Sequence, residues 1–153
     1  MKPLLVGEAN PYGADQRYAL FPHPERSAGY RLALLIMAMP SRNAYLAAFD
    51  RVNLCPERWS APVARARAQE ILAERGVWDH VVLLGSKVSG AFGVPYAPFT
   101  WGQRAWPDSD RRHTLVVLPH PSGLCRAWNE PGAFERARGV LRCAGVLPME
   151  AKP

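Results

Sequence analysis

Short apolar runs alternate along the chain with segments whose apolar positions recur at helical spacing. The runs predict four strands and the periodic segments predict four helices. The strands are expected at residues 3–7, 49–54, 80–84 and 114–118, and the helices at 25–39, 61–75, 87–92 and 131–143. This alternation is typical of parallel strands joined by crossover helices. We therefore expect an α/β fold with a single domain, residues 1–153, built on an open, mainly parallel four-stranded sheet flanked by helices.

Residues 93–110 follow neither the strand period nor the helix period. This stretch is rich in aromatic side chains, with Tyr96, Phe99, Trp101 and Trp106. A long segment without regular structure inside a compact domain usually carries function. We predict a long surface loop here, directly before the last strand.

Composition narrows the class of protein. Lys and Arg outnumber Asp and Glu by 19 to 13, and the net charge of +6 favours a polyanionic partner, either a nucleic acid or an acidic protein. The longest apolar run, residues 32–39, is far shorter than the roughly 20 residues of a membrane span. Three widely spaced cysteines predict neither a disulfide framework nor a four-ligand metal site. We expect a cytoplasmic, monomeric protein with no membrane partner.

Ligands of open parallel sheets bind beyond the carboxyl ends of the strands. The loops that follow the predicted strands are therefore the first places to look for chemistry. The loop after the first strand reads GEANPYG from Gly7, and the loop after the last strand reads HPSGLCR from His120.

These two loops together resemble those of the uracil-DNA glycosylase superfamily. Its members carry a water-positioning loop of types such as G-Q-D-P-Y or G-E-A-P-G after the first strand, and a late loop of the type H-P-S-x-L. The stretch FPHPERSAG from Phe21 is similar to the P-F-V-G-x-A-G stretch of the iron-sulfur branch, and VNLCP from Val52 is similar to the family's second strand. The resemblance covers residues 4–143. It implies a monofunctional DNA glycosylase of base excision repair, acting on uracil or a related pyrimidine.

The resemblance implies two catalytic positions. His120 would donate a hydrogen bond to O2 of the departing base, where negative charge develops in the transition state. On the sugar side, either Asn10 or Glu8 would position the attacking water. Asn10 stands where the classical enzymes have Asp, and an amide cannot act as a base, so a slower enzyme is expected unless Glu8 supplies the carboxylate. The alternative for Glu8 is a helix cap or a surface carboxylate.

Three residues are implied to bind the extruded base. Phe21 would stack on the pyrimidine, Asn53 would pair with its O4 and N3–H, and Tyr12 would pack against C5 and exclude thymine. The alternatives are core packing for Phe21, a cap of the following turn for Asn53, and a surface position for Tyr12.

Five further residues are implied to contact DNA, either single-stranded or a lesion-containing duplex. Leu124 would enter the space that the flipped base leaves, and Arg126 would hold a flanking phosphate or the orphan base. Ser122 would bind a phosphate through its hydroxyl. Ser86 and Lys87 stand at the start of the helix predicted after Gly85, and this position suggests that they bind a phosphate with the help of the helix N-terminus. The alternatives are a buried leucine at the start of the last helix for Leu124 and solvated charges for Lys87 and Arg126.

The chain also departs from the family. The iron-sulfur branch binds its cluster with four cysteines, which this sequence lacks, so we predict no metal and no cofactor. Two rival functions remain open. One is a protein of the same fold that recognises or modifies a base without excising uracil. The other is a non-catalytic DNA-binding or interaction module whose Pro/Trp-rich loop contacts a protein.

Overall fold

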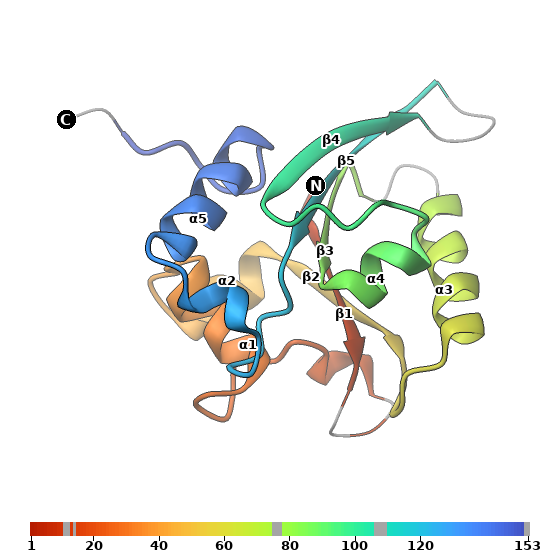
Figure 1. Ribbon diagram of the computed structural model, residues 1–153, viewed down its shortest axis with the longest axis horizontal. Coiled ribbons are helices and arrows are strands. Elements are labelled where there is room, and N and C mark those ends of the chain that lie inside the picture. The colour runs from red at the N-terminus through yellow and green to blue at the C-terminus, as the bar shows by residue number, and fades with distance from the viewer. Residues whose placement is uncertain (11–12, 14, 75–77, 106–109, 152–153) are drawn as a thin grey trace.

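A single five-stranded sheet in the order β2-β1-β3-β5-β4 forms the centre of the computed structural model (Figure 1). The structure describes residues 1–10, 13, 15–74, 78–105 and 110–151. Four strands run parallel, and β4 pairs antiparallel with β5 at one edge. The strands are β1 (Leu4–Ala9), β2 (Asp50–Cys55), β3 (His80–Leu84), β4 (Thr100–Ala105) and β5 (Arg112–Leu118). The α/β class and the mainly parallel sheet agree with the sequence pattern.

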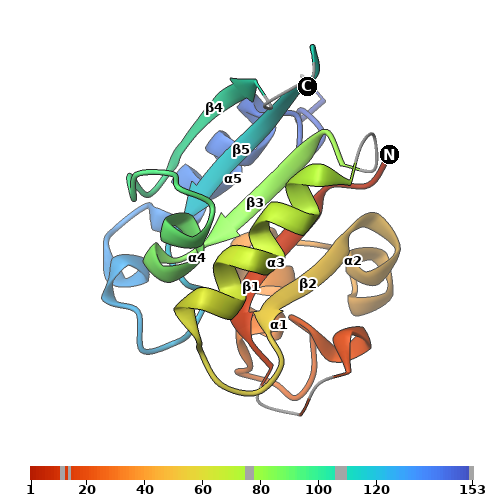
Figure 2. The same cartoon turned by 90° about the vertical axis from the view of Figure 1, so that its right-hand side faces the viewer.

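Helices cover both faces of the sheet (Figure 2). On one face lie α1 (Ala28–Tyr30), the π-helix η2 (Arg31–Ile36), α2 (Arg42–Ala48) and α5 (Ala133–Cys143). On the other face lie α3 (Ala61–Ala73) and α4 (Ser86–Ala91). Because the parallel strands are buried on both sides, they read as continuous apolar runs, as in the fully buried Val81–Leu84 stretch of β3.

The predicted strand count was wrong, because the edge strand β4 lies within residues 93–110, where we expected a loop. All six residues of β4 are exposed, so no alternation of apolar and polar positions marks them in the sequence. Pairing with β5 forms this strand, from Thr100 opposite Val117 to Ala105 opposite Arg112. The strand therefore depends on a tertiary contact rather than on local preference.

The helices also differ from expectation at their ends. The helix expected over 25–39 begins only at Ala28, after Ser27, whose Oγ accepts a hydrogen bond from the Tyr30 amide at 3.1 Å. The sequence pattern missed α2, which begins after Ser41, a second capping serine whose Oγ accepts from the Ala44 amide at 3.0 Å. Two short 3-10 helices, η1 (Gln16–Tyr18) and η3 (Arg126–Asn129), complete the elements.

The parallel arrangement brings the carboxyl ends of β1, β2, β3 and β5 to one edge of the sheet (Figure 2). The segments that leave this edge begin at Asn10, Pro56, Gly85 and Pro119. Among the described residues, no helix is long and apolar enough to cross a membrane.

Candidate active site

A pocket of about 370 Å³ opens at the carboxyl edge of the sheet. Five of the residues singled out in the sequence line it: Glu8, Phe21, Asn53, His120 and Ser122. They come from the ends of β1, β2 and β5 and from the segment before α1, so the fold gathers them from four distant parts of the chain.

His120 is held by its own loop in one tautomer. Its Nδ1 accepts a hydrogen bond from the Ser122 amide at 3.2 Å, so the ring proton of the neutral imidazole sits on Nε2. The His120 carbonyl accepts from Trp128 Nε1 at 2.7 Å, and Arg31 Nε donates to the next carbonyl, that of Pro121, at 3.0 Å. Two side chains from outside the loop therefore fix the backbone on which the imidazole stands.

Burial lowers the pKa of His120 below its ordinary value of 6.5. The nearby positive charge of Lys87 lowers this pKa further, whereas the negative charge of Glu8 acts in the opposite direction. The imidazole is therefore neutral near pH 7 and offers one N–H donor.

Glu8 and His120 meet at Gly85, the residue that follows β3. A Cβ on Gly85 would lie 3.2 Å from the His120 Cβ and 3.5 Å from Glu8 Oε1. Gly85 also has a φ of +100°, a backbone conformation that favours glycine. A side chain at this position would crowd His120 and strain the turn.

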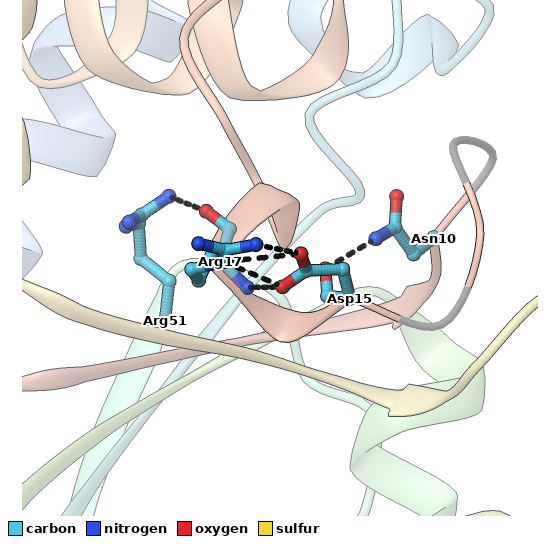
Figure 3. Close-up of polar contacts among 4 residues, drawn as sticks. All are labelled: Asn10, Asp15, Arg17 and Arg51. Carbon is cyan, nitrogen blue, oxygen red and sulfur yellow. Dashed lines mark hydrogen bonds and ion pairs between the residues drawn. The ribbon is translucent and has the colours of Figure 1, made fainter.

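Asn10 is used differently from Glu8, although the two are neighbours in the chain. Its side chain is fully buried, and Nδ2 donates to the Asp15 carbonyl at 3.0 Å (Figure 3). Asp15 in turn caps η1 by accepting from the Arg17 amide at 3.0 Å. Asn10 is not among the described residues that line the pocket. The Asn10 amide thus supports the segment that follows it, whereas Glu8, near the end of β1, lines the pocket.

Asn53 lies on the floor of the pocket and is only 3% exposed. Its backbone amide donates to Gln16 Oε1 at 3.0 Å, while its side-chain amide makes no hydrogen bond with any residue that the structure describes. Gly7 lies opposite Asn53 in the β1–β2 pairing, and a Cβ on Gly7 would collide with Asn53 Oδ1. The glycine therefore makes room for an amide that is free to bind a ligand.

Phe21 forms an aromatic wall together with Tyr18, which meets its ring edge-on at a centroid distance of 5.5 Å. Sequence reasoning missed Tyr18 and also Glu57, which lines the same pocket. Glu57 is the second residue after β2, and its place in a loop that follows a predicted strand could have identified it from the sequence. Tyr18 gave none, because only the fold of η1 brings it to the pocket.

The residues expected to contact DNA lie outside the pocket, with the exception of Ser122. Leu124 is 93% exposed, so it is not the buried leucine that was the alternative. The Leu124 amide donates to Ser122 Oγ at 3.2 Å, and this hydrogen bond fixes the turn that presents the leucine.

The other residues expected to contact DNA are exposed: Ser86, Lys87 and Arg126. Lys87 Nζ lies 5.8 Å from the centre of the Trp59 ring. Tyr12 lies outside the described residues.

Within the described part of the chain, no three His, Cys, Asp or Glu side chains gather in a group that could hold a metal ion. Neither a protein-family model nor a curated protein sequence matches this chain.

Proposed function

We propose that this protein is a DNA glycosylase that hydrolyses the N-glycosidic bond of uracil, or of a related pyrimidine, after the base has been flipped out of DNA. The observation that carries the proposal is the shared pocket. Glu8, Asn53, Phe21 and His120 line one cavity of about 370 Å³. They supply a carboxylate, an amide that has no hydrogen-bond partner among the described residues, an aromatic ring and a neutral imidazole. These are the groups that the chemistry of base excision needs.

His120 suits the base side of the reaction. Cleavage of the glycosidic bond places negative charge on the departing base, and a preorganised donor stabilises this charge strongly in a site with little water. The Ser122 amide occupies Nδ1, which leaves the Nε2–H of His120 to donate. The lowered pKa keeps the ring neutral, so the base leaves as an anion held by a hydrogen bond rather than by proton transfer from an imidazolium.

Glu8 suits the sugar side of the reaction. The deoxyribose gains positive charge in the transition state, and a carboxylate can both stabilise this charge and accept a proton from the attacking water. We assign this role to Glu8 rather than to Asn10, because Glu8 lines the pocket whereas the Asn10 amide donates to the Asp15 carbonyl.

Asn53 and Phe21 suit recognition of the base. A side-chain amide offers a donor and an acceptor side by side, which matches O4 and N3–H of uracil. Cytosine presents a donor where the Asn53 amide needs an acceptor, so the amide disfavours it. The Phe21 ring offers a face for stacking, an interaction worth about 1–3 kcal/mol per base.

The surface around the pocket suits DNA. An apolar side chain that is 93% exposed, Leu124, follows two pocket residues at the tip of a fixed turn. Flipping a base out of the duplex costs a few kcal/mol of unstacking, and an inserted leucine offsets part of this cost. Two exposed basic side chains stand next to pocket residues in the chain, Arg26 before Ser27 and Arg58 after Glu57. The exposed Lys87 adds a positive charge that acts on His120.

Incubation with a labelled single-stranded oligonucleotide that carries one uracil, followed by alkali, tests the proposal. The wild type is expected to give strand cleavage at the uracil, and His120→Ala at equal concentration is expected to give almost none. Intact uracil DNA after incubation with equimolar wild-type protein refutes the glycosylase. Selective binding of the uracil strand without cleavage then favours a protein that recognises a flipped base without excising it.

A further inference from the structure

The pocket wall, which we define as residues 15–21, is tied to the rest of the fold by side chains, whereas its backbone hydrogen bonds, such as that from the Phe21 amide to the Tyr18 carbonyl, lie within the wall itself. Arg51 Nη1 donates to the Ala19 carbonyl at 2.9 Å and to the Arg17 carbonyl at 3.4 Å (Figure 3 shows the latter). The Tyr45 hydroxyl donates to the Leu20 carbonyl at 3.1 Å. Ser27 Oγ donates to the Phe21 carbonyl at 3.4 Å. Phe21, which lines the pocket, stands at the end of this wall.

The backbone of the wall adopts a conformation that it would not choose by itself. Leu20 has a φ of +48°, in the left-handed region that a leucine rarely adopts. Such a conformation persists only where its surroundings over-determine it. Gly29 of α1 packs so closely here that a Cβ on it would collide with the carbonyls of Leu20 and Phe21. The side-chain donors and the close packing of Gly29 therefore hold the wall against the rest of the fold.

Arg51 joins the wall to the floor of the pocket. It precedes Asn53 by two residues on β2, so both side chains project from the same face of the strand. The guanidinium carbon lies 5.8 Å from the centre of the Phe21 ring. Among the described residues, Arg51 Nε is buried with no hydrogen-bond partner, an arrangement that costs stability. The guanidinium thus gives up one hydrogen bond while its Nη1 holds two carbonyls of the wall beside the Phe21 ring.

Tyr45 is a suitable second support. The side chain is fully buried, and burial raises the pKa of its hydroxyl far above the ordinary value. The hydroxyl therefore stays protonated and remains a donor to the Leu20 carbonyl. Burial also lowers the pKa of Arg51, but a guanidinium keeps its charge in proteins.

We propose that Arg51 and Tyr45 are positioning residues of the base pocket. By fixing the carbonyls of Ala19 and Leu20, they set the angle at which Phe21 offers its ring to the flipped base. This proposal rests on the proposed function, because it concerns how that pocket holds a pyrimidine.

A double-mutant cycle on binding tests the proposal without relying on cleavage. The probe is a labelled single strand with one 2′-fluoro-2′-deoxyuridine, whose glycosidic bond resists hydrolysis, and fluorescence anisotropy gives its Kd. Arg51→Met and Tyr45→Phe are each expected to weaken binding by about tenfold, which corresponds to loss of much of one stacking interaction. In a protein that already carries Phe21→Ala, either change is expected to weaken binding of the probe little further. The reason is that the losses of affinity are not additive for residues that act through one another.

Two controls separate positioning from general effects. Arg42→Met removes another arginine that lies over an aromatic ring, 5.6 Å from the centre of Tyr30, and neither residue lines the pocket. Its affinity for the probe is expected to equal that of the wild type. A strand of the same sequence with thymidine in place of the probe nucleotide reports on phosphate contacts alone. Thermal melting shows that each variant is folded at the assay temperature, and Tyr45→Phe carries the test if Arg51→Met does not fold.

The outcomes are distinguishable. Loss of affinity in the wild-type background but not in the Phe21→Ala background, confined to the uracil strand, supports the positioning role. An additive loss, or an equal loss on the thymidine strand, overturns it. Wild-type excision of uracil together with unchanged binding by both variants overturns the positioning role and leaves the proposed function standing. A wild type that neither excises uracil nor prefers the uracil strand overturns both.

Discussion

Two loops meet at the pocket, one after β5 and one after β1, and they employ their polar side chains in different ways. In the β5 loop, Ser122 occupies Nδ1 of His120 and leaves Nε2 without a partner among the described residues. In the β1 loop, Asn10 is fully buried and donates to the Asp15 carbonyl, while Glu8 lines the pocket. A side chain is available for chemistry only where its own loop has not already engaged its polar atoms. On this criterion we propose His120 and Glu8 as the reactive side chains and Asn10 as a structural one.

The largest effect is expected from the β5 loop. His120→Ala should lower the rate of uracil excision by about 100- to 1000-fold, because the donor acts where charge develops in the transition state. The Kd for DNA should change little, since the ground state carries no such charge. Single-turnover rates and anisotropy, measured side by side, check this expectation. Equal losses in rate and affinity would make His120 a binding residue instead.

Glu8→Gln tests the β1 side. We expect the excision rate to fall by about 100-fold, in the range of lost general base catalysis, with the fold intact. Gln keeps the shape and removes the charge, so folding effects are small. A rate within experimental error of the wild type would remove Glu8 from the mechanism and return the water-positioning role to Asn10.

Asn10→Ala is expected to affect stability rather than chemistry. Removal of the amide should lower the free energy of unfolding by about 1–3 kcal/mol, the cost of disrupting a buried hydrogen bond. Urea denaturation measures this loss. Asn53→Ala is the matched control, because its amide has no internal partner among the described residues, and it should lose uracil affinity with less loss of stability. Excision by folded Asn10→Ala that is as slow as that of Glu8→Gln would contradict the assignment.

Leu124→Ala should separate duplex from single-stranded substrates. Because Leu124 is 93% exposed, stability should stay within about 0.5 kcal/mol of the wild type. Excision from a U·G duplex should fall by about tenfold, since less of the few kcal/mol of unstacking is offset. Excision from single-stranded DNA, where no stack must be opened, should not change. A similar loss on both substrates would indicate a contact to the flipped nucleotide itself.

The smallest effect concerns pH. Burial first, and Lys87 second, lower the pKa of His120 below 6.5 in the folded protein. Below 6.5 the unfolded state therefore binds more protons at this position than the folded state, and the free energy of unfolding falls as pH decreases through this window. The His120→Gln variant should lose this part of the pH dependence. Urea denaturation above and below pH 6.5 gives the free energy of unfolding of both proteins. If this free energy changes with pH to the same extent in the wild type and in His120→Gln, the lowered pKa of His120 is contradicted.

The core of the fold could be predicted because its strands are buried on both faces. The run Val81–Leu84 is apolar for that reason, and β3, from His80 to Leu84, has the predicted bounds. The edge strand β4 could not be predicted, because its six residues are exposed and only their pairing with β5 makes them a strand. The same holds for the pocket wall, since the left-handed φ of Leu20 is imposed by contacts with Tyr45, Arg51 and Gly29.

The sequence by itself determined the α/β class and the loops in which chemistry is to be sought, because periodicity reports burial and parallel strands end at a common edge. It also named the residues His120, Phe21 and Asn53, which the fold then brings into one pocket. Only the tertiary structure decided between Glu8 and Asn10 as pocket-lining side chains. Two polar residues two positions apart at a strand end look alike in a sequence, and the direction of each side chain and the partner that it meets depend on the tertiary structure around them.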